Sequence, residues 1–222
     1  MGKLILYGMD ASAPVRSVIL TLNALGLPFE YKVVNLLAKE QLKPEFLKMN
    51  PLHTVPTLDD DGFYVYDSHA INAYLVAKYG KDGKESLYPK DLQQRAIVDQ
   101  RMHYDSSVVG RTLRAITFPL FRLNETQIPK ARIDALADVY TTLETFLNSN
   151  EYIAGKHLTI ADFHIIAILS TIEIFLAVDA GRYPKLSAWM QRITELPYYA
   201  EGNGNRLVQC ATFFKSKNFT IV

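Results

Sequence analysis

The sequence predicts two halves of different class, an α/β N-terminal domain over residues 1–81 and an all-α C-terminal domain over residues 91–222, with a linker at 82–90. Segments with strand-like apolar patterns all precede residue 80. The stretch "GKDGKESLYPKD" at 80–91 is polar and contains glycine and proline, which is typical of a linker. Beyond it, apolar residues recur with helical spacing only.

The N-terminal half alternates short strands with helices. Strands are expected at 3–7, 29–34, 57–58 and 63–66, and helices at 14–25, 42–49 and 68–79. Gly26 ends the first helix, because glycine readily adopts the left-handed conformation found at helix C-termini. Gly62, in "DDDG", suits the turn between the last two strands. The predicted order is therefore β-α-β-α-β-β-α.

The C-terminal half reads as helices alone. They are expected at 91–120, 129–148, 159–178, 184–195 and 205–216. Pro119 is expected to bend or end the first of them. The very apolar third helix carries ionisable residues that would be costly in a membrane, so it is predicted to be the central helix of the domain. Thr159 and Asp162 fit a capping box at its start, which predicts a structural role for Asp162.

The composition excludes several classes of partner and site. A formal net charge of +1 provides no basic excess, so neither nucleic acid nor an anionic membrane is expected as a partner. Cys210 is the single cysteine, which excludes an internal disulfide and a cysteine-rich zinc site. No metal is expected. The N-terminus runs directly into a strand-like segment without a signal-peptide pattern, so a cytoplasmic location is expected.

One polar cluster lies at the end of the predicted hairpin. In "HTVPTLDDDGFYVYDSHA", residues 53–70, Pro56 stands in front of a strand, although proline removes a backbone donor. The run Asp67-Ser68-His69 then opens a helix. A helix N-terminus attracts anions, and Asp67 or Ser68 also suits the N-cap position. The cluster therefore has two readings, a helix cap and a ligand contact, and both can hold.

The element order and five motifs resemble a cytosolic glutathione transferase over the whole chain. The motifs are "SAPVRSV" at 12–18, "NPLHTVPTL" at 50–58, "DSHAI" at 67–71, "SLYPKD" at 86–91 and "LTIADF" at 158–163. The sequences of these motifs are most similar to those of the insect-type delta and epsilon classes, and to epsilon in particular. The resemblance implies an α/β thioredoxin-like N-terminal domain plus an all-α C-terminal domain, the cytosolic glutathione transferase architecture.

The resemblance also implies a glutathione site and glutathione as co-substrate. A cis bond before Pro56 would leave the Val55 backbone free to pair with the peptide as an added strand. Asp67 would take the γ-glutamyl ammonium and Ser68 its carboxylate, while His53 and Gln41 would lie near the glycyl carboxylate. The implied glutathione contacts are Gln41, His53, Thr54, Val55, Pro56, Asp67, Ser68, His69 and Arg114.

Ser12 is the expected catalytic residue. It stands where a thioredoxin-like redox protein carries the first cysteine of Cys-x-x-Cys, and the absence of both cysteines excludes disulfide exchange there. Its hydroxyl would donate a hydrogen bond to the glutathione sulfur and so favour the thiolate. Lowering the pKa of that thiol by about two units requires roughly 2.7 kcal/mol, and one charge-assisted hydrogen bond supplies about 1.5–3 kcal/mol. Two alternatives remain open: Ser12 can be an N-cap only, and Tyr7 can be the donor instead.

A hydrophobic electrophile is the implied second substrate. The residues matching the family's hydrophobic site are Gly110, Leu113, Thr117, Phe118, Phe121, Leu207 and Phe213, although such positions also suit a plain core. A homodimer is implied, with His69 near its twofold axis. The expected function is glutathione conjugation in xenobiotic detoxification, with dehydrochlorination or peroxide reduction as further reactions. A non-catalytic ligand carrier or interaction module, and an enzyme dedicated to one metabolite, are the alternatives.

Overall fold

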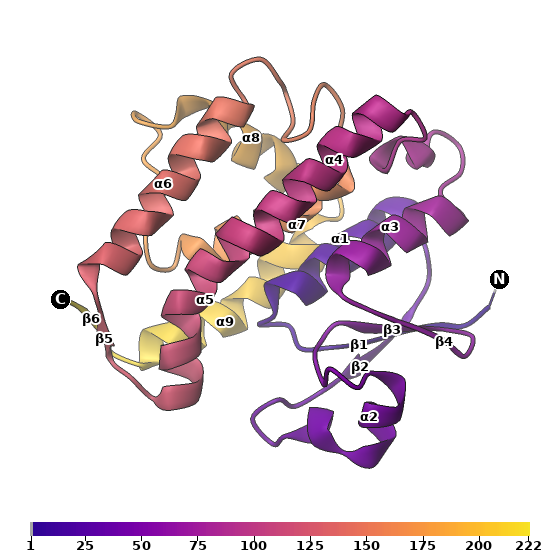
Figure 1. The fold of residues 1–222 in the computed structure, drawn as a ribbon, viewed down its shortest axis with the longest axis horizontal. Helices are drawn as coiled ribbons and strands as arrows, with labels where there is room; N and C mark the ends of the chain where they lie inside the picture. The colour runs from indigo at the N-terminus through magenta and orange to yellow at the C-terminus, as the bar shows by residue number, and fades with distance from the viewer. Residues whose placement is uncertain (1) are drawn as a thin grey trace.

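The computed structural model describes residues 2–222 and consists of a sheet-containing half and a helical half (Figure 1). The sheet is formed by β1 (Leu4–Gly8), β2 (Glu30–Val33), β3 (Thr57–Asp60) and β4 (Phe63–Tyr66). Its order is β2-β1-β3-β4, with β1 parallel to β2 and the other neighbours antiparallel. The helices of this half are α1 (Ala13–Leu25), α2 (Pro44–Met49) and α3 (Ser68–Tyr79). The predicted fold class of this half is confirmed.

Local sequence signals fix the ends of these elements. α1 begins after Ser12 and ends at Gly26, which lies in the left-handed region with φ 68°. The hairpin between β3 and β4 turns at Asp61 and Gly62, with φ values of 55° and 90°. The expected short helix at 42–49 begins two residues later, at Pro44, and follows a 3-10 turn at Glu40–Leu42. Proline suits the first position of a helix, where no donor is needed.

The helical half surrounds one fully buried helix. Its helices are α4 (Leu92–Tyr104), α5 (Gly110–Phe118), α6 (Lys130–Phe146), α7 (Ile160–Ile172), α8 (Pro184–Thr194) and α9 (Asn205–Ser216). Every residue of α7 is buried, so the predicted central helix is confirmed. Among residues 2–222, no helix is long and apolar enough to cross a bilayer.

Two expectations for this half were wrong. A two-stranded parallel sheet joins β5 (Gln127–Ile128) to β6 (Thr220–Ile221), where only helices were expected. Two residues are too few to show the alternation by which a strand is recognised. The third helix ends at Ile172 rather than at 178. The chain turns there because Phe175 packs against Phe214 and Phe219, with ring centroids 5.3 and 5.5 Å apart.

The helix expected at 91–120 is interrupted by π-helical turns. One turn, η3 (Asp105–Val109), separates α4 from α5, and a second, η4 (Pro119–Leu123), follows α5. α5 ends at Phe118, directly before Pro119, as predicted; the chain then continues through η4 and leaves it at Asn124, which has φ 54°. Such π-helical turns are frequent at functional sites.

The two halves are joined chiefly by α1 lying against α7. Arg16 of α1 is completely buried there. Its Nη2 donates to the Ala167 carbonyl at 2.8 Å and to Thr171 Oγ1 at 2.5 Å, and its Nε donates to Asn203 Oδ1 at 2.8 Å. The boundary between the halves is therefore fixed by a buried cation as well as by apolar packing.

Candidate active site

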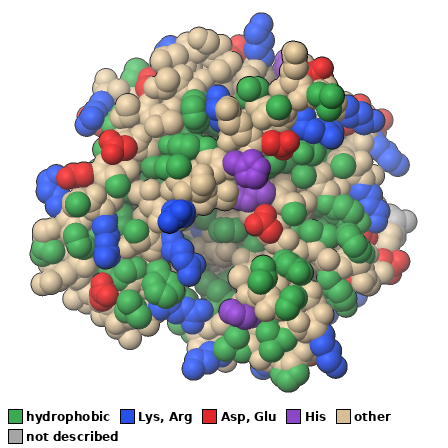
Figure 2. Space-filling model, viewed as in Figure 1, with side chains coloured by type: hydrophobic (Ala, Val, Ile, Leu, Met, Phe, Trp, Pro, Cys, Tyr) green, Lys and Arg blue, Asp and Glu red, His purple; other side chains and the backbone are tan. Residues whose placement is uncertain are grey.

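A cleft of about 270 Å³ opens between the two halves, and Figure 2 shows the corresponding hollow on this face. Both halves contribute to its walls. The N-terminal half supplies Ala13, Pro14, Thr54, Val55, Pro56, Asp67, Ser68 and His69. The helical half supplies Asp105, Ser106, Gly110, His164 and Ile168. Six of the residues predicted to bind glutathione thus meet in this one cleft, although they come from separate segments.

Val55 presents free backbone groups to the cleft. The Val55–Pro56 peptide bond is cis, as the resemblance implied. Within residues 2–222, neither the N–H nor the C=O of Val55 forms a hydrogen bond. The neighbouring Thr54 carbonyl is different, because it accepts from Asn50 Nδ2 at 3.0 Å and from Thr57 Oγ1 at 3.1 Å. A short unpaired edge therefore faces the space where an extended ligand could lie.

Asp67 is the N-cap of α3. Its Oδ1 accepts from the backbone N–H groups of His69 at 2.9 Å and Ala70 at 3.3 Å. Its backbone has φ 79°, which is unusual for a residue other than glycine and is common at functional sites. Hydrogen bonding from His69 lowers the pKa of Asp67. The capping reading is confirmed for Asp67, and its carboxylate still lines the cleft.

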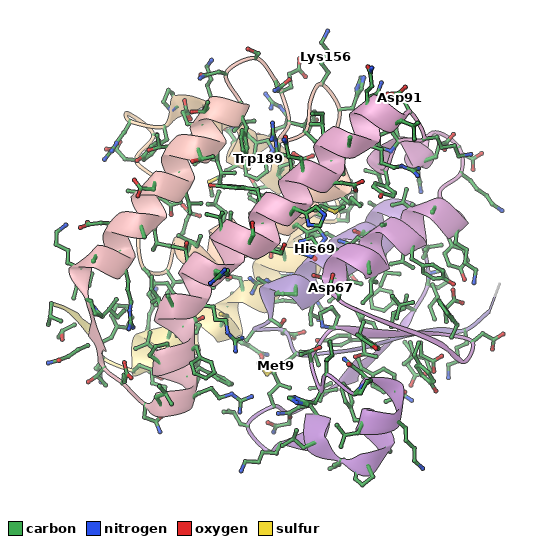
Figure 3. All side chains as sticks on the ribbon, in the orientation of Figure 1. Met9, Asp67, His69, Asp91, Lys156 and Trp189 are labelled. Carbon is green, nitrogen blue, oxygen red and sulfur yellow. The ribbon has the colours of Figure 1, made fainter. Side chains whose placement is uncertain are left out.

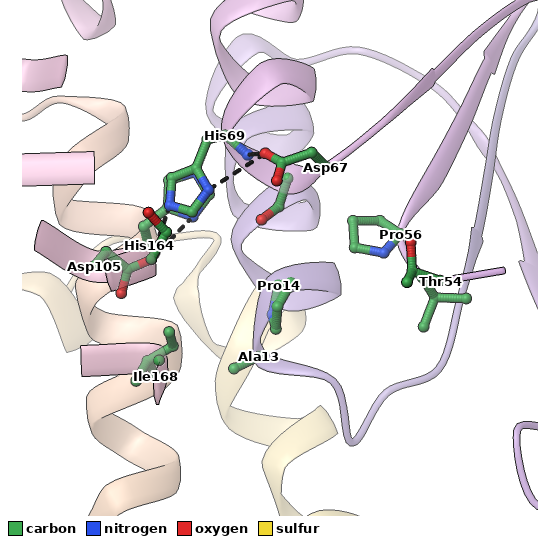
Figure 4. Close-up of a pocket in the computed structure, with 13 residues that line it drawn as sticks. Ala13, Pro14, Thr54, Pro56, Asp67, His69, Asp105, His164 and Ile168 are labelled. Carbon is green, nitrogen blue, oxygen red and sulfur yellow. Dashed lines mark hydrogen bonds and ion pairs between the residues drawn. The ribbon is translucent and has the colours of Figure 1, made fainter. Parts of the chain in front are cut away.

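Two histidines and a buried aspartate form a cluster on the cleft wall (Figure 4). His69 Nε2 lies 2.9 Å from Asp105 Oδ2, and His69 Nδ1 lies 3.4 Å from Asp67 Oδ1. The rings of His69 and His164 are stacked, with centroids 4.0 Å apart and planes 12° apart. Asn72 Nδ2 donates to His164 Nε2 at 3.0 Å. Figure 3 shows His69 and Asp67 where the two halves meet.

The two stacked histidines differ in charge. Burial lowers the pKa of His69, but hydrogen bonds to Asp105 and Asp67 outweigh this effect and raise it to about 9. Burial and the positive charge of His69 lower the pKa of His164 well below its ordinary value. At neutral pH, His69 is therefore an imidazolium and His164 is neutral. Burial also raises the pKa of Asp105, and His69 opposes that shift.

The same cluster is the one group of possible metal ligands found among residues 2–222. His69, Asp105 and His164 each offer one ligand atom within 4.8 Å of the others. Imidazole lone pairs lie in the ring planes, so two stacked rings do not direct them to one point. The charge on His69 also disfavours a cation. The geometry suits a hydrogen-bonded network better than a metal centre, and the expectation of no metal stays a prediction.

Ser12 lies at the edge of this site, at the start of α1. It is half-buried, and its Oγ accepts from the Val15 N–H at 3.5 Å, a long capping bond. Ala13 and Pro14, which follow it, line the cleft, whereas Ser12 itself is not among the lining residues. Tyr7 is also outside the lining and packs edge-on against Phe46, with centroids 6.2 Å apart. Neither the Ser12 nor the Tyr7 hydroxyl is thus singled out as the donor to the glutathione sulfur.

Comparison with known proteins identifies the family. The family model described as "Glutathione S-transferase, N-terminal domain" matches residues 6–85, and "Glutathione S-transferase, C-terminal domain" matches residues 98–197. Glutathione S-transferase 1 of Manduca sexta is 45% identical over 216 residues, covering 96% of this chain and 97% of the relative. The chain belongs to the glutathione S-transferase family. The predicted family and enzyme class are confirmed.

Two solved glutathione transferases extend the similarity to the whole structure. An epsilon-class enzyme from the housefly, Musca domestica, is 56% identical, with a TM-score of 0.96 over 99% of this chain and 100% of that one. A glutathione transferase homologue of Drosophila mojavensis, solved with bound glutathione, is 52% identical, with a TM-score of 0.96 over 100% of both chains. The predicted similarity to the epsilon class is confirmed.

Three residues predicted to contact glutathione lie outside the cleft lining of this transferase. His53 is exposed and has φ 47°. Gln41 is 4% exposed, and its Oε1 has no hydrogen-bond partner among residues 2–222. Arg114 is exposed, with its guanidinium 4.8 Å from the Phe118 ring centroid. Their predicted contacts therefore need a ligand that reaches beyond the lined volume.

Of the residues predicted for the hydrophobic substrate, Gly110 lines the cleft. Leu113 is buried in the core. Phe121 of η4 and Phe213 of α9 contact each other, with ring centroids 5.4 Å apart, so these two elements do meet. The remaining three, outside the lining, are Thr117, Phe118 and Leu207. Sequence reasoning missed Asp105 and His164 as site residues. For His164, the signal was an ionisable residue inside an apolar helix, which was used only to exclude a membrane span.

Proposed function

We propose that this glutathione transferase conjugates glutathione to hydrophobic electrophiles, with Ser12 as the hydroxyl that stabilises the thiolate. The observation that carries the proposal is the convergence of three features on one cleft. They are the free backbone of Val55, the N-terminus of α3 with Asp67, and the N-terminus of α1 after Ser12. Each matches one chemical group of a γ-glutamyl tripeptide thiol.

Glutathione would be held along its length. Its γ-glutamyl ammonium would meet Asp67, and its α-carboxylate would meet Ser68 and the amides at the start of α3, because helix N-termini attract anions. Its cysteinyl backbone would pair with Val55. His53 and Gln41 would lie toward the glycyl carboxylate, to which the side-chain amide N–H₂ of Gln41 would donate.

The thiol would be activated by the start of α1. A hydrogen bond from Ser12 to the sulfur, together with the helix dipole, favours the thiolate over the thiol. The proton leaves to solvent before the electrophile arrives, so no general base is needed. The sulfur lone pair then forms a carbon–sulfur bond, and a displaced leaving group departs with its bonding electrons. Gly110 and Ile168 leave an apolar wall for the electrophile.

Detoxification of foreign compounds, a homodimeric assembly and a cytoplasmic location complete the proposal and stay predictions. A non-catalytic carrier of the same fold would need neither the hydroxyl of Ser12 nor a helix N-terminus directed at the sulfur. Ser12 directly precedes Ala13 and Pro14, the cleft-lining residues at the start of α1, and this arrangement supports the enzyme. A dedicated enzyme for one metabolite would share this machinery and would differ only in the breadth of electrophiles that it accepts.

The test is a titration of the thiolate absorbance of bound glutathione against pH. Wild type, Ser12→Ala, Tyr7→Phe and the linker control Ser86→Ala should be compared. We expect a thiol pKa about two units below the free value in wild type and the control, with loss of roughly 1.5–3 kcal/mol of stabilisation in Ser12→Ala. Binding with an ordinary thiol pKa would favour the carrier. A lowered pKa that reverts only in Tyr7→Phe would move the role to Tyr7.

A further inference from the structure

Ser12 is the last residue of a tight turn. The Ser12 N–H donates to the Met9 carbonyl at 2.9 Å, so Met9 to Ser12 form a four-residue turn between β1 and α1. Asp10 and Ala11 are its two central residues. Met9 marks this turn in Figure 3, below Asp67 in that view. Any movement of Asp10 is passed to Ser12 through only two peptide units, so whatever fixes Asp10 also fixes Ser12.

Asp10 is held at two points by arginines. Its carboxylate Oδ1 accepts from Arg206 Nη1 at 2.5 Å, and its backbone carbonyl accepts from Arg16 Nη1 at 3.4 Å. The side chains of Asp10 and Arg206 are 24% and 19% exposed, so this ion pair is partly sheltered from solvent. Screening by water is correspondingly weaker than at a fully exposed pair.

Arg206 is itself fixed on both sides. It lies in the first turn of α9, directly after the π-helical turn η5 (Ala200–Gly204), which packs against α1. Its Nε donates to the Glu201 carbonyl at 3.0 Å, and its guanidinium lies 4.8 Å from the ring centroid of Tyr31 on β2. The contacts with Asp10, Glu201 and Tyr31 together restrict the guanidinium to one orientation. A lysine, which has a single flexible ammonium group, would be oriented less well.

We infer that Arg206 is a positioning residue for thiol activation, which holds the Met9–Ser12 turn from the C-terminal helix so that the Ser12 hydroxyl meets the glutathione sulfur. The inference rests on the proposed role of Ser12. Partly exposed ion pairs contribute little to the free energy of unfolding. If the Asp10–Arg206 pair had only a stabilising role, its loss would therefore leave the folded enzyme and its activity nearly unchanged. Misplacement of a reacting group by a fraction of an ångström, in contrast, has a large effect on rate.

The inference is tested with Arg206→Gln, Arg206→Lys, Asp10→Asn and the double variant Asp10→Asn/Arg206→Gln. Lys130→Gln, which removes the exposed Lys130–Asp134 pair on α6, is the matched control. We expect Arg206→Gln to raise the pKa of the bound thiol by roughly half a unit to one unit and to lower kcat by roughly three- to tenfold, with a smaller change in KM for glutathione. Arg206→Lys should lie between it and wild type.

The double variant should be no worse than either single variant, because both remove the same contact. The melting temperature should change as little as in the control. An unchanged thiol pKa and kcat in Arg206→Gln, or equal losses in Lys130→Gln, would overturn the inference and leave the role of Ser12 intact. Loss of folding in Arg206→Gln with normal thiol pKa in Arg206→Lys and Asp10→Asn would also overturn it. An ordinary thiol pKa in wild type would instead reject the role of Ser12 and, with it, this inference.

Discussion

His69 shows how a single side chain is used twice. Its imidazolium lies between Asp67, which caps α3 and lines the cleft, and Asp105, a buried carboxylate of the helical half. The charge therefore links the start of α3 to the helix across the cleft. The charged ring of His69 also stacks on the neutral ring of His164, whose Nε2 accepts a hydrogen bond from Asn72. His69 was expected near a twofold axis, and its side chain is engaged within its own chain.

The pH dependence of stability should report this charge. The pKa of His69 is about 9 in the folded chain, and in the unfolded chain it is about 6.5. The stabilisation is complete below pH 6.5 and is lost as the pH rises through 9, because the folded state binds one proton more between these values. We expect wild type to lose about 1–3 kcal/mol of unfolding free energy between pH 6.5 and 9.5 relative to His69→Gln. Urea unfolding at the two pH values measures it, and parallel pH profiles of the two proteins would contradict it.

Short sequence motifs were enough to predict the cleft residues that are neighbours in the sequence. They failed to predict the cleft residues that only folding brings together. Pro56, Asp67 and Ser68 stand in one hairpin-to-helix segment, and all three line the cleft. Asp105 and His164 are separated from their partners His69 and Asn72 by 36 and 92 residues. No local pattern shows which helix faces will meet, so their place in the site could not be predicted.

At the scale of elements, α7 depends on the carboxylate at its first turn. Asp162 is completely buried and accepts from the N–H groups of Ile153 and Thr159, at 2.9 and 2.8 Å. It also accepts from Trp189 Nε1 at 2.9 Å, so one carboxylate ties α7 to the preceding loop and to α8. The predicted capping box is present, but the bonds to Ile153 and Trp189 were not predicted.

Asp162→Ala should therefore destabilise the fold strongly. Its removal leaves several buried donors without an acceptor, each costing about 1–3 kcal/mol. We expect a loss of about 3 kcal/mol or more in unfolding free energy, with little change in glutathione affinity of the folded fraction. Urea unfolding and a glutathione titration measure the two effects, with Asp134→Ala on exposed α6 as control. A melting temperature equal to that of wild type would refute the structural role.

Elements with a clear period were predictable, and elements defined by distant partners were not. α1 and α3 end where glycine follows, at Gly26 and Gly80. The strands β5 and β6 exist because Thr220 and Val222 donate to the carbonyls of Thr126 and Ile128, each 94 residues earlier in the sequence. A π-helical turn such as η3 has hydrogen bonds that span one residue more than those of an α-helix, and a single turn of five residues is too short to show a period of its own.

On the scale of the whole molecule, the two halves pack together through α1 and α7. Arg16 donates to groups on α7 and at Asn203 without a carboxylate partner among its hydrogen bonds. Burial lowers its pKa, but an arginine remains charged in proteins. Its acceptors in the helical half depend on this one side chain from the other half, so the interface is sensitive to its loss.

Arg16→Met should weaken this coupling. We expect a loss of about 2–4 kcal/mol, because the buried acceptors lose their donor. At a fixed protein concentration, Trp189 fluorescence reports the helical half and far-ultraviolet circular dichroism reports the whole chain. The two urea transitions should coincide in wild type and separate in the variant. Coincident curves at the wild-type midpoint in Arg16→Met would show that apolar packing alone holds the halves together.

The position of α1 against α7 has a consequence for the chain while it is being made. Arg16 and its acceptor Ala167 are 151 residues apart. At the usual speed of a ribosome, α1 emerges roughly 10–30 s before the helix that will cover it has been synthesised. During that interval its apolar face is not covered by α7, and its arginine lacks its partners Ala167, Thr171 and Asn203. We therefore expect the nascent first half to expose, until α7 has been made, apolar surface of the kind that chaperones bind.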